Sequence, residues 1–176
     1  APQEIPPIKG AAIYGVVEIM RGCGRGCSFC SPTLRQRHSF PIEHILKEVE
    51  LNAMGGSRMI ILQTDDLLLY QAKANFIPNR EAIVNLIHEV SKVEGVEFLQ
   101  AAHASLAPVV YDKGIIEEIA PSMVDRSVWT CRGARCASVE VGIETGSPRL
   151  MRQYMRGKML PYSPEQWPDV VVRSIE

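Results

Sequence analysis

Three cysteines that lie close together are the residues in this chain best suited to metal chemistry. Cys23, Cys27 and Cys30 have the spacing Cys-x3-Cys-x2-Cys within residues 21–30, RGCGRGCSFC. Thiolates are the usual protein ligands of iron–sulfur clusters, and the short spacing lets all three turn toward one centre. The glycines between them allow the backbone to wrap around a bulky group. We therefore predict a metal centre on this loop, and three ligands on a four-iron cluster would leave one iron open.

Two features of the sequence bear on the identity of that metal. Arg21 and Arg25 place positive charge beside the thiols, which should lower their pKa and favour the ligating thiolate form. Structural zinc normally has four ligands in two pairs, and Cys131 with Cys136 could complete such a set. These two cysteines could also bind a second metal, form a redox pair, or be ordinary small loop residues. Zinc and a pair of buried thiols therefore remain alternatives to a cluster.

The composition is that of an ordinary soluble globular protein. The chain has 176 residues, with 46% hydrophobic and 22% charged residues and a formal net charge of −1. This charge gives no general attraction to nucleic acid or to anionic membranes. No segment approaches the roughly 18 consecutive apolar residues that span a bilayer, and the N-terminus has no signal-peptide core. Five cysteines are too few for a disulfide scaffold, and thiolate ligands need a reducing compartment, so we expect a cytoplasmic protein.

The hydrophobic pattern predicts an α/β fold in which strands and helices alternate. Residues 1–10 are proline-rich and are expected to form an extended linker, followed by a domain over residues 11–176. The apolar runs are continuous rather than alternating, which favours parallel strands joined by right-handed helical crossovers. The expected strands are 11–20, 59–62, 96–100 and 137–143. The first expected helix starts at the signal Ser39-Phe40-Pro41 and stops at Gly55-Gly56, and the others are 80–93, 112–120, 148–156 and 163 to the chain end.

Polar residues follow each of the four expected strands. The cysteine loop follows the first, Thr64-Asp65-Asp66 the second, His103 with Ser105 the third, and Glu144 comes at the end of the fourth. In parallel βα folds the active site lies at the carboxyl ends of the strands. We therefore expect these residues to share one site, although each could instead be a turn residue, a helix cap or a paired surface group.

The cysteine loop resembles the signature of the radical S-adenosylmethionine (SAM) superfamily, in which an aromatic residue, here Phe29, precedes the third cysteine. Residues 142–147, GIETGS, resemble the fourth-strand segment of the subgroup that includes cobalamin-binding enzymes and methylthiotransferases. The resemblance covers residues 14–156. It implies a partial, TIM-like barrel of six strands, of which this chain would supply four as the N-terminal portion. It also implies that the chain is a fragment of a longer protein.

The resemblance also assigns roles to individual residues. The three cysteines would bind a [4Fe–4S] cluster. Thr64-Asp65-Asp66 departs from the family's Gly-Gly-Glu-like segment but would still contact the amino group of SAM, Glu144 would accept from the ribose, and Arg156 would pair with the SAM carboxylate. On residue type alone, Glu144 could instead pair with Arg149 or Arg152. The residues expected to bind SAM are Phe29, Thr64, Asp65, Asp66, His103, Ser105, Glu144 and Arg156.

By this resemblance the chain would be the core of a radical SAM enzyme. The bound cluster would cleave SAM to a 5′-deoxyadenosyl radical that serves hydrogen abstraction or methyl or methylthio transfer, with electrons from an external donor. Cobalamin would enter through a domain outside this chain. The sequence does not identify the substrate, small molecule or macromolecule. The alternative function is a non-catalytic zinc or iron–sulfur binding module.

Overall fold

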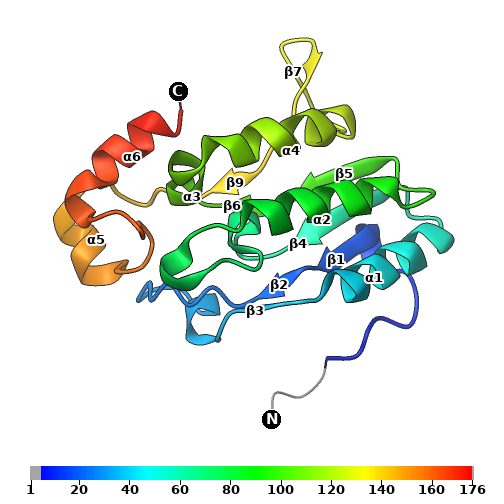
Figure 1. Ribbon diagram of the computed structural model, residues 1–176, viewed down its shortest axis with the longest axis horizontal. Helices are drawn as coiled ribbons and strands as arrows, with labels where there is room; N and C mark the ends of the chain where they lie inside the picture. The colour runs from blue at the N-terminus through cyan, green and yellow to red at the C-terminus, as the bar shows by residue number, and fades with distance from the viewer. Residues whose placement is uncertain (1–4, 176) are drawn as a thin grey trace.

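Parallel strands and the helices that connect them form the larger part of the molecule (Figure 1). The computed structural model describes residues 5–175. A three-stranded parallel sheet has the order β1-β4-β5, and β6 pairs in parallel with β9. The strands are β1 (Val16–Glu18), β4 (Met59–Gln63), β5 (Phe98–Ala101), β6 (His103–Ala104) and β9 (Glu140–Val141). The α/β class and the parallel strands predicted from the sequence are confirmed.

β5 and β6 are two halves of one strand that changes partner at Ala102. The Ala102 N–H donates to Leu62 O of β4 at 3.3 Å, and Ala102 O accepts from the N–H of Glu140 at 3.0 Å. The chain therefore places four strand positions side by side in sequence order, as predicted, although the fourth strand spans only Glu140–Val141 of the expected residues 137–143. The further prediction of a barrel goes beyond these strands and is taken up below as a proposal.

The first predicted strand is wrong over residues 11–15. These residues include a short 3₁₀ turn, η1 (Ile13–Gly15), in which Tyr14 has φ 58°. Gly15 has φ +64°, and a Cβ there would lie 2.0 Å from the carbonyl oxygen of Met59. The chain therefore enters the sheet through a tight turn that only glycine fits. β1 is correspondingly short, and a second strand, β2 (Met20–Arg21), pairs antiparallel with β3 (His38–Ser39) before and after the cysteine loop.

Three long helices pack on the sheet, and Figure 1 shows them along the same side of it. They are α1 (Ile42–Met54), α2 (Arg80–Lys92) and α4 (Lys113–Asp125). The first two have the predicted positions because their buried residues recur at helical spacing and Asn79 caps α2 by accepting from the Ala82 N–H. The third was predicted over residues 112–120, but it begins at Lys113 and continues through Pro121 to Asp125.

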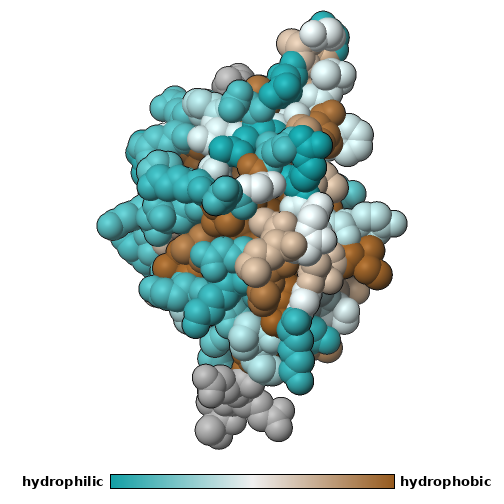
Figure 2. Space-filling view, turned by 90° about the vertical axis from the view of Figure 1, so that its right-hand side faces the viewer, coloured by the Kyte–Doolittle hydropathy of each residue, from teal (hydrophilic) through white to brown (hydrophobic). Residues whose placement is uncertain are grey.

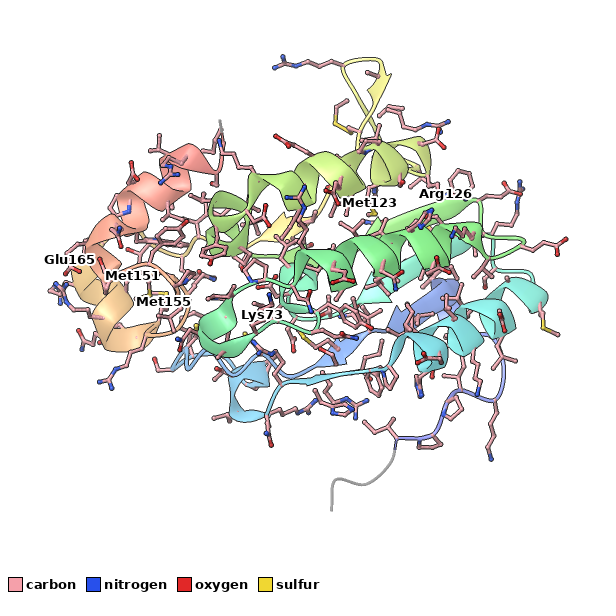
Figure 3. The ribbon with its side chains drawn as sticks, viewed as in Figure 1. Lys73, Met123, Arg126, Met151, Met155 and Glu165 are labelled. Atoms are coloured by element: carbon pink, nitrogen blue, oxygen red, sulfur yellow. A yellow bond between two sulfur atoms is a disulfide. The ribbon has the colours of Figure 1, made fainter. Side chains whose placement is uncertain are left out.

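A second hydrophobic core lies beyond the carboxyl ends of the strands, where Figure 1 places α5 (Pro148–Tyr154) and α6 (Trp167–Arg173). It also takes in α3 (Leu106–Tyr111), a helix that the hydrophobic pattern did not indicate. Met151, Met155, Met159 and Trp167 are buried in this core together with Cys27 of the cysteine loop. Figure 3 labels Met151 and Met155 on and just after α5. The cysteine loop thus lies between two cores.

The opposite end of the molecule is formed by the amino ends of the strands. Figure 2 views this end and shows hydrophobic side chains exposed among polar ones, away from the cysteine loop. The N-terminal segment is held against α1, because the Ile8 N–H donates to the buried Glu48 at 3.0 Å. Residues 1–4 of the predicted linker lie outside the described residues. Within residues 5–175 no helix is long and apolar enough to cross a membrane.

Candidate functional site

The cysteine loop turns back on itself immediately after β2. Gly22 has φ +76°, and a Cβ there would lie 2.7 Å from the carbonyl oxygen of Gln36, so the two ends of the loop approach as closely as glycine permits. The Cys23 N–H donates to Pro32 O at 3.3 Å, and the Cys30 N–H donates to Cys27 O at 3.2 Å. The loop is therefore closed by its own backbone contacts, as its glycines suggested.

One pocket of about 320 Å³ brings the three cysteines together with the residues at the strand ends. Nine of the eleven predicted site residues line it: Cys23, Cys27, Phe29, Cys30, Asp65, Asp66, His103, Ser105 and Glu144. Arg25, Glu140, Gly142 and Lys158 also line this pocket. The expectation that the strand ends form one site is thus supported by their positions, while the role of each residue remains a prediction.

Two predicted residues do not line the pocket. Thr64 is buried at the end of β4, where its Oγ1 accepts from the N–H of Asp66 at 3.2 Å, so it shapes the turn that presents the acids. Arg156 is exposed and follows the end of α5 by two residues. The helix ends earlier than predicted, and this turns Arg156 away while Lys158 points into the pocket.

Cys23 and Cys27 do not have the lowered pKa that the neighbouring arginines suggested. Burial raises the pKa of Cys23, and this outweighs the opposing effects of the backbone N–H and the charge of Arg25. Burial likewise raises the pKa of Cys27, with Lys158 acting in the opposite direction. Arg21 is paired with Glu18 through its Nε at 2.8 Å. The sequence showed the charges but not the degree of burial, which dominates.

The arrangement of the thiols bears on which metal group would fit. Within residues 5–175 no three His, Cys, Asp or Glu side chains are grouped closely enough to hold a single metal ion. A zinc ion would need its thiolates within about 4 Å of one another, because each Zn–S bond is about 2.3 Å. A cluster instead takes each thiolate on a different iron, which allows a wider separation. The three thiols line one pocket of the described chain.

Arg25 lies beneath the pocket as a buried ion pair with Asp66. Its Nη2 donates to Asp66 Oδ2 at 3.2 Å and to Ser105 Oγ at 2.9 Å. Asp66 in turn accepts from the N–H groups of Leu68 and Ser105 and from the Ser105 hydroxyl. Both Asp66 oxygens are therefore engaged within the protein. From the sequence Arg25 was expected to act only through its charge on the thiols, and nothing in its spacing indicated these partners.

Two further contacts between side chains lie at the strand ends, an ion pair and a histidine–carboxylate contact. Glu144 has φ 55°, an uncommon conformation for a residue with a side chain, and its Oε2 lies 2.5 Å from Lys158 Nζ. Its partner is thus neither Arg149 nor Arg152. His103 Nε2 lies 3.1 Å from Glu140 Oε2, while its buried Nδ1 has no hydrogen-bond partner among the described residues. Glu140, Glu144 and Lys158 thus place acidic and basic groups on the wall of the pocket formed by residues 140–158.

Cys131 and Cys136 form a disulfide in the hairpin of β7 (Thr130–Cys131) and β8 (Ala134–Arg135). Cys131 is exposed and Cys136 is half-buried, and Figure 1 shows the hairpin projecting away from the rest of the molecule. They therefore form a pair as one alternative suggested, and they neither reach the cysteine loop nor pack in a core. The zinc site that would combine both cysteine groups is contradicted by this position.

Replacement of Gly157 by alanine is expected to destabilise the wall of this site. A Cβ at Gly157 would lie 2.2 Å from the carbonyl oxygen of Arg25, so the backbone of the loop would have to move. Overpacking of this kind costs about 1–3 kcal/mol, which urea unfolding would measure. Gly146→Ala is the matched control, because nothing lies within 4 Å of a Cβ there. Equal stability of the two variants would contradict the close approach of residues 25 and 157.

Comparison with known proteins shows where this architecture occurs. No family model matches the chain. The chain is 28% identical over 146 residues to the ribosomal protein uS12 methylthiotransferase RimO of Cytophaga hutchinsonii, covering 82% of this chain and 30% of that protein. It is 35% identical over 105 residues to the protein of the same name from Clostridium botulinum strain Hall, covering 58% and 22%. The chain thus spans less than a third of the length of these relatives.

Two solved structures share the fold. The cobalamin-dependent SAM radical enzyme OxsB, with aqua-cobalamin and SAM bound, superimposes with a TM-score of 0.59 at 18% identity over 90% of this chain and 22% of that chain. The radical SAM methyltransferase TsrM from Kitasatospora setae, with cobalamin and a [4Fe–4S] cluster bound, gives 0.57 at 17% identity over 91% and 28%. Together, the homologues and the shared fold confirm the resemblance of this chain to radical SAM enzymes and methylthiotransferases.

Proposed function

We propose that this chain forms the cluster- and SAM-binding part of a radical SAM enzyme, on the wall of a partial βα barrel. The observation that carries the proposal is the single pocket shared by the three cysteines and the polar residues of the successive strand ends. Its position at the carboxyl ends of parallel strands is where βα folds bind their ligands. The homology to methylthiotransferases over 82% of the chain supports the same reading.

The residues of the pocket divide the work of binding between them. Cys23, Cys27 and Cys30 would hold a [4Fe–4S] cluster through three irons and leave the fourth for SAM. With SAM bound, such a cluster supplies the one-electron chemistry that yields a 5′-deoxyadenosyl radical. Phe29 lines the pocket beside Cys30 and would restrict the access of water to it.

The amino and carboxylate groups of SAM would meet side chains of opposite charge. Asp65 lines the pocket and is exposed, whereas both oxygens of Asp66 are already engaged, so Asp65 would accept from the SAM amino group. Glu144 would accept from the ribose hydroxyls. Lys158, whose side chain is 13% exposed, would donate to the carboxylate, the role that the resemblance gave to Arg156. His103 and Ser105 would complete the pocket floor.

Replacement of Lys158 by methionine is expected to weaken SAM binding about tenfold or more. A hydrogen bond to a charged group contributes about 1.5–3 kcal/mol, and methionine keeps the length of the side chain without the charge. Equilibrium dialysis with the reconstituted chain would measure the dissociation constant. Arg156→Met provides the comparison: a larger loss in that variant than in Lys158→Met would return the assignment to Arg156.

The reaction that this site serves is, in our proposal, hydrogen abstraction or methyl or methylthio transfer. Methylthio transfer has support from the sequence relatives, which are named methylthiotransferases, and methyl transfer has support from the fold shared with TsrM. Cobalamin, as in OxsB and TsrM, would need a domain outside this chain. An external electron donor would reduce the cluster.

Metal analysis after anaerobic incubation with iron and sulfide would test the proposal. We expect a brown protein with about four irons and four sulfides per chain. The same incubation with zinc should leave the chain with clearly less than one tightly held zinc, because the three thiols do not converge on one point. Stoichiometric zinc together with little iron would instead support the alternative of a non-catalytic zinc module.

A further inference from the structure

Arg25 is placed differently from the other arginines of the chain. Among the described residues it is the one arginine that is buried, at 5% exposed. Its guanidinium donates to four groups from three separate segments: Asp66 after β4, Ser105 after β6, and the carbonyl oxygens of Gly157 at 2.9 Å and Lys158 at 2.8 Å. Only a planar fork can reach all of these acceptors at once.

The backbone around Arg25 is joined to the same distant segment. Cys27 and Met155 form an antiparallel β-bridge, and the Ser28 N–H donates to the Tyr154 carbonyl oxygen at 2.8 Å. The carbonyl oxygen of Arg25 approaches Gly157 closely enough to exclude any side chain there. The cysteine loop and residues 154–158 are therefore one joined strip, although about 130 residues separate them in the sequence.

An aromatic side chain holds the guanidinium from the loop that follows β4. Phe76 lies with its ring centroid 5.0 Å from Arg25 Cζ and 5.2 Å from Arg37 Cζ. Asn75 and Phe76 have φ of 57° and 59°, so two successive residues with side chains adopt the left-handed conformation here. Such strain persists only where the surroundings impose it. The contacts of Phe76 therefore belong to the same assembly as those of Arg25.

We propose that Arg25 is a positioning residue that couples the cluster-binding loop to the basic wall of the SAM pocket, so that Lys158 faces the pocket only while the cysteine loop is in place. This inference rests on the proposed function for its ligands and on the contacts above for its geometry. The backbone carbonyl oxygen of Lys158 accepts a hydrogen bond from Arg25, and its ammonium group pairs with Glu144. The cysteine loop and the wall line the same pocket. The binding of the cluster would thereby order the residues that receive SAM.

Hydrogen exchange of the metal-free chain tests the coupling without any ligand. In Arg25→Lys a single ammonium group replaces the guanidinium group and cannot make all four of its contacts. The backbone amides of residues 26–28 and 154–160 should therefore exchange about tenfold faster than in the natural chain. Amides of α1 and α2 should keep their protection. Arg37→Lys is the matched control, because Arg37 contacts the same ring but donates only to Ala72 O and does not line the pocket.

The coupling to SAM binding is tested by a double-mutant cycle in the reconstituted chain. If Arg25 acts by placing Lys158, Arg25→Lys should weaken SAM binding about tenfold in the natural chain and less than about twofold in the Lys158→Met background. Arg37→Lys should change neither value. Additive losses from Arg25→Lys and Lys158→Met would overturn the inference, as would unchanged exchange at residues 154–160.

Two further outcomes remain distinguishable. A natural chain that takes up no iron would refute the proposed function, while the exchange experiment would still decide the geometric part of the inference. If Arg25→Lys also exposes α1 and α2, the variant has unfolded as a whole. Phe76→Leu then replaces it, since leucine keeps an apolar side chain against the core and removes the contact of the ring with the guanidinium. About threefold faster exchange confined to residues 26–28 and 154–160 is expected. Unaltered exchange in Phe76→Leu would count against the coupling.

Discussion

Replacement of Cys27 by alanine is expected to lower the bound iron of the reconstituted chain from about four atoms to less than one. Cys27 is the middle ligand of the predicted set and is 8% exposed, so neither water nor another side chain of the pocket could take its place as a soft ligand. Iron and sulfide analysis of the natural chain and the Cys27→Ala variant, prepared in parallel, would measure the loss of iron. The brown colour of the chain should disappear with it.

The control for this experiment is Cys136→Ser. That residue lies in the exposed hairpin, outside the pocket, and its replacement should leave about four irons in place. Circular dichroism would show whether Cys27→Ala is still folded, since Cys27 also packs against Met151 and Met155. Full iron content in folded Cys27→Ala would contradict the assignment of the three cysteines as cluster ligands.

Replacement of Asp66 by alanine is expected to destabilise the chain by about 3–5 kcal/mol. The Asp66 and Arg25 side chains are 3% and 4% exposed, so alanine would leave a buried guanidinium without its counter-charge. It would also leave the N–H groups of Leu68 and Ser105 without their acceptor. Urea unfolding monitored by circular dichroism would measure the difference in the free energy of unfolding.

Asp65→Ala serves as the neighbouring control. Asp65 is exposed, and its replacement should change the free energy of unfolding by less than about 0.5 kcal/mol. The same variant should weaken SAM binding, because Asp65 is the acid left free to meet the amino group. Similar stability losses in Asp65→Ala and Asp66→Ala would show that the Arg25–Asp66 pair does not support the site as we describe it.

Local pattern was sufficient to predict the parts of the fold whose residues satisfy one another nearby. Helix α1 ends at Met54 because Gly55, the predicted stop, follows it and glycine readily leaves the helical conformation. Helix α2 begins after the capping residue Asn79. The apolar run at Met59 became β4, in which Ile60 and Leu62 are buried while Met59 and Ile61 are partly exposed. Since parallel strands end at one edge, their polar ends could be predicted to meet there, and nine of the eleven chosen residues do line one pocket.

What the sequence could not show depends on contacts between distant segments. Arg25 finds its partners 41 to 133 positions away, and no local pattern indicates such pairs. The predicted helix over residues 148–156 ended two residues early, and this small shift exchanged Lys158 for Arg156 at the pocket. Strand 11–20 was interrupted because Gly15 passes against Met59, a contact that appears only when the sheet is assembled.

The response of the reduced cluster to SAM tests the central claim most directly. The chain, reconstituted anaerobically and reduced, would be examined by electron paramagnetic resonance before and after addition of SAM. Our account predicts a changed spectrum and about one SAM bound per chain, because the fourth iron is open and the surrounding side chains are placed to hold SAM. A four-iron cluster whose spectrum is the same with and without SAM would contradict it.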